Sequence, residues 1–161
     1  MTGTLDAQTS RRYDALIQRD RVHGSLYTDP GIFGEELRKI WYRTWVFVGH
    51  GSEVAQPNDH VGKRLGLQDV IMTRDRDGEL HVLLNRCAHR GNRVCEDAGG
   101  NSSTFRCPYH GWTYRNTVEL AGFPFFKGYG ARHLDLPLAR VPRVDSYHGF
   151  VFGSFAPDGP A

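Results

Sequence analysis

The segments Cys87-Ala88-His89-Arg90-Gly91 and Cys107-Pro108-Tyr109-His110-Gly111-Trp112 carry the most specific signal in this 161-residue chain. Each segment holds one cysteine and one histidine, and residues 90–106 separate the two pairs. Two such segments that meet as loops supply two thiolates and two imidazoles. That donor set suits either a tetrahedral zinc ion or a two-iron cluster whose irons have different ligands.

The spacing within each segment weighs against zinc. Zinc fingers usually bring their ligands as like pairs, cysteine with cysteine and histidine with histidine, about two to five residues apart. The single residue between Cys87 and His89 fits that pattern poorly. In a two-iron cluster the irons lie side by side, so one loop can send its cysteine to one iron and its histidine to the other. A zinc-stabilised interaction module therefore remains only as a rival interpretation.

The whole pattern, Cys-x-His and then Cys-x-x-His after 17 residues, resembles the Rieske [2Fe–2S] signature. Over residues 41–155 the chain is similar to the α subunits of aromatic-ring-hydroxylating oxygenases. The resemblance implies a mainly β fold, a Rieske-type antiparallel β-sandwich with cluster-binding loops at its tip. It also implies that Cys87 and Cys107 bind one iron, and that His89 and His110 bind the other and lie nearest to solvent.

The same resemblance implies an electron-transfer function. In that family the Rieske domain takes electrons from a ferredoxin or a reductase and passes them to a mononuclear non-haem Fe(II) in a separate catalytic domain. The complete system uses NAD(P)H to oxygenate aromatic compounds, and the large subunit forms a trimer-type homo-oligomer or a hetero-oligomer with a β subunit. The stretch Asp145-Ser146-Tyr147-His148 is similar to the Asp-x-x-His with which the family's motif for binding the catalytic iron begins, but no second histidine of that motif follows. We therefore expect electron transfer without hydroxylation, and a stand-alone Rieske ferredoxin is the alternative.

Residues beside the predicted ligands should tune the reduction potential. Replacing two thiolates by neutral imidazoles makes the cluster less negative, so an electron is added more easily. Respiratory Rieske proteins have a disulfide cysteine and a serine where this chain has Tyr109 and Trp112, and the missing hydroxyl predicts a potential toward the lower end of roughly −150 to +300 mV. We expect both aromatic residues to shield the cluster from water. Arg90 should either contact an acidic partner or pair with Glu96 or Asp97.

The rest of the composition predicts an ordinary cytoplasmic domain. Three cysteines cannot build a disulfide framework, and Cys95, outside both segments, is expected to be a small buried apolar residue. His23, His50, His60 and His81 have no ligand spacing around them. A net charge of +2 with interspersed signs gives no basic surface for nucleic acid. The sequence shows neither a signal peptide nor an apolar stretch of about 20 residues, so we expect no contact with a membrane.

The first forty residues predict a short helical segment. One helix should begin at the cap Ser10 and extend through Asp20, and a second start signal is Asp29 followed by Pro30. The apolar stripe of the second helix would consist of Phe33, Leu37, Ile40 and Trp41. In the resembling family this segment packs on the catalytic domain.

From residue 45 onward, short β-rich runs alternate with gaps that contain glycine, asparagine and proline. Residues 75–78 predict a hairpin turn, and residues 85–101 are expected to form the longest loop. Asn116 is expected to take a left-handed backbone conformation, at a position where the family usually has glycine. The domains expected are the helical segment 1–40, the Rieske domain 41–156 and a linker 157–161 to the absent catalytic domain. The predicted strands are 45–48, 69–73, 80–84, 103–106, 112–115, 140–145 and 149–155.

Overall fold

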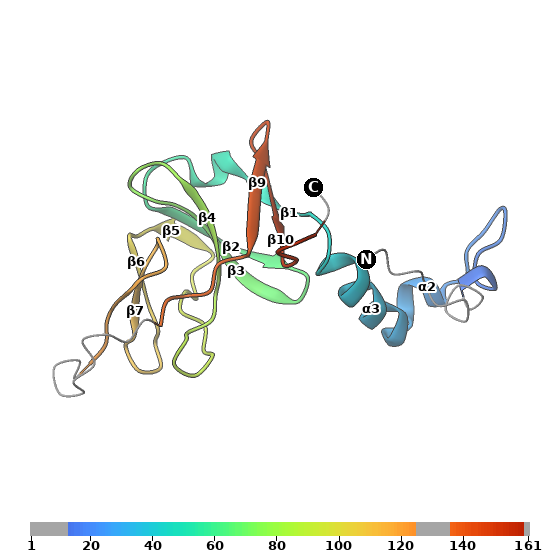
Figure 1. Ribbon diagram of the computed structural model, residues 1–161, viewed down its shortest axis with the longest axis horizontal. Coiled ribbons are helices and arrows are strands. Elements are labelled where there is room, and N and C mark those ends of the chain that lie inside the picture. The colour runs from blue at the N-terminus through green and yellow to red at the C-terminus, as the bar shows by residue number, and fades with distance from the viewer. Residues whose placement is uncertain (1–12, 125–135, 160–161) are drawn as a thin grey trace. The chain divides into compact units, whose positions relative to one another are not determined.

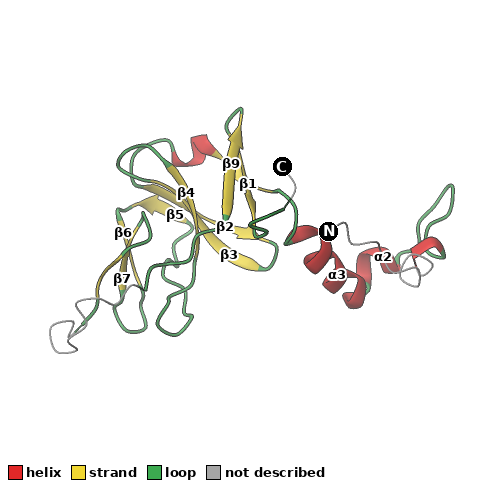
Figure 2. Ribbon diagram, viewed as in Figure 1, coloured by secondary structure: helices red, strands yellow, loops and turns green. Residues whose placement is uncertain are grey.

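The computed structural model describes residues 13–124 and 136–159. The chain divides into two compact units, Met1–Ile40 and Trp41–Ala161, and each is described by itself. Strands lie in the second unit, and apart from one short 3₁₀ turn the helices lie at the start of the chain (Figure 2). In the described part of the chain, no helix has the length and apolar content needed to cross a membrane.

The second predicted helix start is confirmed. The Asp29 carboxylate accepts hydrogen bonds from the backbone N–H groups of Gly31 (2.7 Å) and Ile32 (3.1 Å), and Pro30 occupies the first turn. Helix α3 (Pro30–Glu36) follows helix α2 (Ser25–Thr28) and continues into the π-helical turn η1 (Leu37–Trp41).

The predicted stripe of α3 is only partly correct. Leu37 is buried, but the interior position in the preceding turn belongs to Ile32 rather than to Phe33. The π-helical turn widens the hydrogen-bond spacing and rotates the following residues relative to an α-helical stripe. Ile40 and Trp41, which lie in this turn, are 51% and 40% exposed, and Phe33 in the preceding α-helical turn is 45% exposed.

The first predicted helix is wrong in its second half. The chain reverses between Ile17 and Val22, which pair as an isolated antiparallel bridge, and the N–H of Gln18 donates to the carbonyl of Arg21 at 2.8 Å. Four residues at helical spacing are too weak a signal to exclude such a turn. The predicted cap Ser10 lies outside the described residues.

The described residues of the Trp41–Ala161 unit form three antiparallel sheets, which confirms the mainly β prediction (Figure 1). The first sheet, in the order β1-β10-β9, contains β1 (Val46–His50), β10 (Phe150–Ser154) and β9 (Arg143–Tyr147). The second, β4-β3-β2-β5, contains β4 (Leu80–Leu84), β3 (Gln68–Arg74), β2 (Asp59–Leu65) and β5 (Gly99–Asn101). The third contains β6 (Thr104–Arg106), β7 (Thr113–Arg115) and β8 (Leu120–Gly122), and η2 (Gly51–Val54) follows β1.

The central strand β3 separates two apolar cores. Val70 and Met72 belong to a core with residues of β1 and β10, whereas Ile71 belongs to a core with Cys87 and Cys107. Successive side chains of a strand point to opposite faces, so both faces of this sheet are covered. The second core therefore lies directly beneath the two segments that carry the predicted ligands.

All seven predicted strands are present, 80–84 with the predicted ends and the other six with one or both ends shifted, and the predicted hairpin at residues 75–78 joins β3 to β4. Three strands were not predicted. Strand β2 mixes glycine, lysine and arginine with few apolar residues, and β5 and β8 are three-residue strands containing glycine. Pairing with neighbouring strands, rather than their own composition, makes these segments β-structure.

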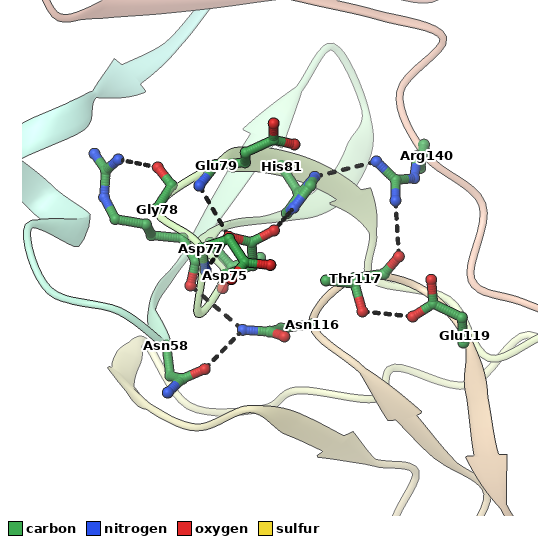
Figure 3. Close-up of polar contacts among 12 residues, drawn as sticks. Asn58, Asp75, Asp77, Gly78, Glu79, His81, Asn116, Thr117, Glu119 and Arg140 are labelled. Carbon is green, nitrogen blue, oxygen red and sulfur yellow. Dashed lines mark hydrogen bonds and ion pairs between the residues drawn. The ribbon is translucent and has the colours of Figure 1, made fainter.

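The predicted left-handed backbone at Asn116 is wrong, because Val118 takes the positive φ of 98° instead. Asn116 is buried, and its side-chain amide donates to the Asn58 side-chain oxygen (3.2 Å) and to the Arg74 carbonyl (3.3 Å; Figure 3). These two bonds orient the side chain toward β3, so the left-handed turn falls two residues later. The Val118 carbonyl accepts from the N–H of Leu138 at 3.0 Å.

Candidate metal centre

The two predicted ligand segments fold as the same loop. In the first loop, residues 87–92, the N–H of Cys87 donates to the carbonyl of Asn92 (2.7 Å), and the N–H of Gly91 donates to the carbonyl of Cys87 (2.8 Å). The second loop, residues 107–112, repeats both bonds, from Cys107 to Trp112 (2.7 Å) and from Gly111 to Cys107 (2.9 Å). The glycines have φ values of 75° and 70°, a backbone conformation that side chains disfavour.

The four predicted ligands lie at two depths. Cys87 and Cys107 are 3% and 2% exposed, whereas His89 and His110 are exposed. The two imidazole rings lie 4.8 Å apart between centroids, so the two loops meet at their tips. Figure 1 shows the loop after β4 and the loop between β6 and β7 projecting from the same end of the β unit.

This donor set fits a two-iron, two-sulfide cluster. Both thiols are free rather than joined in a disulfide, and each loop offers one buried sulfur and one more superficial imidazole. Buried thiols beside an apolar core suit a cluster whose sulfur ligands are kept from water, and exposed imidazoles suit an outer iron.

A second group of possible metal ligands, Asp75, Glu79 and His81, is a hydrogen-bond network (Figure 3). The guanidinium of Arg140 donates to His81 Nδ1 at 3.1 Å, so the Nε2–H of His81 donates to the Asp75 carboxylate at 2.8 Å. The other oxygen of that carboxylate accepts the N–H groups of Asp77 and Glu79, both at 2.9 Å. An arginine in contact with the imidazole opposes the binding of a cation there.

Tyr114 is a residue in contact with the first predicted ligand loop that the sequence analysis missed. Its hydroxyl accepts the N–H of Ala88 at 3.1 Å and lies 3.1 Å from Cys87 Sγ. Burial, reinforced by the neighbouring Cys87 sulfur, raises the pKa of the Tyr114 phenol, so the group keeps its proton. The hydroxyl oxygen accepts the N–H of Ala88, and its hydrogen can be donated to Cys87 Sγ when that sulfur is a thiolate. The available sequence signal was the alternation from Trp112 into β7, in which Trp112 and Tyr114 are buried and Thr113 and Arg115 are not.

The buried Asn85, which the sequence analysis also missed, holds the backbone that follows the first loop through three side-chain hydrogen bonds. Asn85 accepts the N–H groups of Val94 (2.9 Å) and Cys95 (3.0 Å) and donates to the carbonyl of Cys95 (2.7 Å). Cys95 is buried, as predicted, and burial raises the pKa of its thiol. A protonated, buried thiol is a poor nucleophile.

Asn92 directs its side-chain amide toward Cys107 Sγ, with the nitrogen 3.9 Å from the sulfur.

The aromatic residues of the second loop lie against the two histidines. Trp112 is buried and stacks face to face on His89, with centroids 4.9 Å apart and an interplanar angle of 2°. Tyr109 is 57% exposed and lies 3.8 Å from the His110 ring. The Arg90 guanidinium lies over the Tyr109 ring at 5.7 Å, and within the described residues it forms no ion pair with Glu96 or Asp97.

His60 is a buried residue with a polar side chain in an apolar setting. It is 6% exposed, packs edge-on against Phe105 at 5.2 Å, and neither ring nitrogen finds a partner among the described residues. Burial lowers the pKa of His60 below its usual 6.5, despite the opposing charge of Asp97. The folded chain therefore holds this imidazole in its neutral form.

We expect His60 to make the fold less stable in acid. Below about pH 6.5 the unfolded chain binds a proton at His60, whereas the folded chain binds it only at lower pH. Protonation therefore favours the unfolded state, and the free energy of unfolding decreases as the pH falls below 6.5. Replacing His60 by leucine should reduce the loss of melting temperature between pH 7.5 and 5.5. The exposed His23→Leu variant is the control, and equal pH dependence in all three proteins would contradict the assignment.

The comparison with protein families defines the class of protein. Residues 44–148, more than half of the chain, match the Rieske [2Fe-2S] domain. The chain belongs to this family, whose cofactor fits the donor set described above.

The similar proteins are subunits of oxygenases. The chain is 43% identical over 154 residues to the N,N-dimethyl phenylurea N-demethylase subunit alpha of Sphingobium sp. (strain YBL2), covering 93% of this chain and 33% of that protein. It is 37% identical over 148 residues to the large oxygenase component of the naphthalene 1,2-dioxygenase system of Pseudomonas putida, covering 90% and 32%. The structure of naphthalene 1,2-dioxygenase from Rhodococcus sp. bound to indole matches with a TM-score of 0.85 and 37% identity, over 96% of this chain and 36% of that one.

These relatives are large or alpha oxygenase subunits rather than small ferredoxins. The chain spans about a third of their length. The matched third contains the Rieske domain, so the comparisons describe the electron-carrying part of such a subunit.

Proposed function

We propose that this chain is the electron-transfer domain of a larger aromatic-compound oxygenase subunit. Cys87 and Cys107 would hold one iron, and His89 and His110 the other. When bound, the [2Fe–2S] cluster supplies a carrier for one electron at a time. The observation that carries the proposal is the pair of identical loops, with both thiols buried and both imidazoles exposed at one tip.

The chain's own residues have distinct tasks in this proposal. The apolar core beneath the loops excludes water from the two sulfurs. Tyr114 and Asn92 direct hydrogen-bond donors at Cys87 and Cys107. Trp112 would fix the plane of His89 by stacking, and the exposed imidazoles would be the ligands that a partner can approach.

The partners in the proposal follow from the relatives. A ferredoxin or reductase would donate the electron, and a mononuclear non-haem Fe(II) in a catalytic domain would receive it. The relatives support an oxygenase with aromatic substrates, in a homo-oligomer or together with a β subunit. Three free cysteines support a reducing, cytoplasmic location.

The domain limits are part of the same proposal. The Rieske domain would comprise residues 41–156, with the helical segment 1–40 packing on the catalytic domain and residues 157–161 leading onward. The separation of the structure between Ile40 and Trp41 supports the first limit.

The 161-residue chain should accept electrons but oxidise no aromatic substrate. Among the described residues, the possible ligand group outside the two loops is Asp75, Glu79 and His81, which has a single histidine, whereas an open mononuclear iron is held by two histidines and one carboxylate. Iron-loaded chain, incubated with reductant, oxygen and naphthalene, should show reversible one-electron reduction and no diol by chromatography. Turnover-dependent product would contradict the proposed division of labour.

A further inference from the structure

Trp112 of the second ligand loop stacks on two rings at once. Its indole lies 4.9 Å from the His89 imidazole at an interplanar angle of 2°, and 4.8 Å from the Phe123 ring at an angle of 15°. We call His89, Trp112 and Phe123 the ring stack. It joins a predicted ligand of the first loop to a residue that immediately follows strand β8.

Strand pairing brings Phe123 to Trp112. Strands β7 and β8 are antiparallel with Thr113 opposite Gly122, so the next positions outward, Trp112 and Phe123, face each other across the pair. Side chains at directly opposite positions of neighbouring strands contact each other. The stacking of these two rings is therefore a consequence of the register between β7 and β8.

Phe123 is itself held in place by its surroundings. It is half-buried and packs against the core that contains Cys87 and Cys107. The following residue, Pro124, lies over the second loop, because a Cβ added to Gly111 would be 3.1 Å from Pro124 Cγ. The segment that begins at Phe123 therefore contacts the core and the second loop together.

The ring stack is the main restraint on the His89 imidazole. Metal-binding histidines usually donate their second ring N–H to a carboxylate or a carbonyl, and that bond fixes the orientation of the ring. Within residues 13–124 and 136–159, neither ring nitrogen of His89 makes such a bond. Its ring contacts are the exposed His110 and the buried Trp112. A buried indole stacked face to face is the contact that can fix the imidazole plane.

The two predicted histidine ligands are restrained unequally. Tyr109, which lies against His110, is 57% exposed. Trp112, which lies against His89, is 9% exposed and has Phe123 stacked on it as well. A change at Phe123 should therefore act on one imidazole and leave the other as it is.

We propose that Phe123 is a positioning residue for the cluster ligand His89 and acts through Trp112. The inference rests on the proposed function for the identity of the metal group. While the Phe123 ring is in place, close packing keeps the indole from tilting away from the imidazole, so His89 keeps one orientation. Without that ring the indole has space to tilt, and His89 takes a range of orientations.

The test compares Phe123→Ala with the unmodified chain, both carrying the cluster and ¹⁵N-labelled histidine. Pulsed EPR of the reduced cluster measures the hyperfine coupling of each coordinating nitrogen. In Phe123→Ala one of the two couplings should broaden and the other should stay sharp. Loss of iron to a chelator should become about tenfold faster, at the lower end of the 10–100-fold effect of removing a residue that orients a metal ligand.

Two further replacements separate stacking from simple burial. Phe123→Tyr keeps the flat ring and should restore both the sharp coupling and the slow loss of iron. Phe123→Leu keeps an apolar side chain without a flat face, and its broadened coupling should resemble that of Phe123→Ala.

The matched control is Leu120→Ala. Leu120 lies on β8 and is partly buried against the same core, but its partner across the strand pair is Tyr114 rather than Trp112. Both alanine variants should lower the melting temperature, because both remove apolar contacts with one core. Only Phe123→Ala should broaden a nitrogen coupling.

Two results would overturn the inference. One is a Phe123→Ala variant whose nitrogen couplings and rate of iron loss equal those of the unmodified chain. The other is the same broadening in Leu120→Ala, which would assign the effect to general loss of packing.

Failure of the proposed function is separately visible, because the unmodified chain would then carry zinc without labile sulfide and give no EPR signal. The zinc-bound chain is diamagnetic, so nuclear Overhauser effects between the Trp112 and His89 rings can be measured in it. They should weaken in Phe123→Ala, and unchanged intensities would overturn the inference.

Discussion

Cys87→Ser and Cys107→Ser variants are expected to lose iron and acid-labile sulfide almost completely, whereas Cys95→Ser should retain both. The first two cysteines begin the repeated loops and point their sulfurs into one core. Serine oxygen is a poor substitute for a soft thiolate, so the cluster cannot assemble. Cys95 is bound through its backbone to Asn85, and its thiol has no role in either loop.

The measurement is iron and sulfide content per chain, with the visible absorbance of the cluster. Equal amounts of iron and sulfide, about two of each per chain, are expected in the unmodified protein. Stoichiometric zinc without sulfide would instead support the zinc-stabilised module. Loss of iron in Cys95→Ser would show that the ligands have been assigned wrongly.

Tyr114→Phe is expected to make the reduction potential more negative by roughly 30–60 mV. When Cys87 is a thiolate ligand it has no hydrogen to give, so the phenol 3.1 Å away becomes the donor, and that bond is worth more when an added electron makes the sulfur more negative. A hydrogen bond to a charged group contributes about 1.5–3 kcal/mol in total, of which only the difference between the two redox states appears in the potential. About 1.4 kcal/mol corresponds to 59 mV for one electron.

The control is Tyr109→Phe, which removes the hydroxyl of an exposed tyrosine in the second loop. Voltammetry at pH 7 should show a smaller change in that variant than in Tyr114→Phe. Tyr114→Phe should also lower the melting temperature, because the N–H of Ala88 loses its acceptor. A potential equal to that of the unmodified chain would mean that the phenol does not act on the sulfur.

The presence of Tyr114 revises the contacts expected from sequence. The replacement of serine by Trp112 removes one hydroxyl donor relative to respiratory Rieske proteins. The structure adds another from β7, and Asn92 contributes an amide 3.9 Å from Cys107 Sγ. The potential therefore depends on donors that belong to both loops and to the strand that follows the second one.

The sequence alone determined the features that depend on neighbouring residues. The cysteine and histidine spacing identified both loops, Asp29 and Pro30 located a helix start, and the turn at residues 75–78 located a hairpin. Each of these signals lies within a few residues, where side-chain chemistry and allowed backbone angles act directly. The same locality explains the family resemblance, since its motif is contained in two loops.

Only the tertiary structure decided the contacts between distant segments. Tyr114 reaches Cys87 across 27 positions of sequence, and Asn116 reaches Asn58 across 58. Such pairs depend on strand register and on packing in the second core, because a shift of one residue would turn each side chain to the opposite face. The burial of His60, whose ring nitrogens have no hydrogen-bond partner among the described residues, and the positive φ of Val118 arise in the same way. They are properties of assembled sheets and loops, which no local pattern of residues encodes.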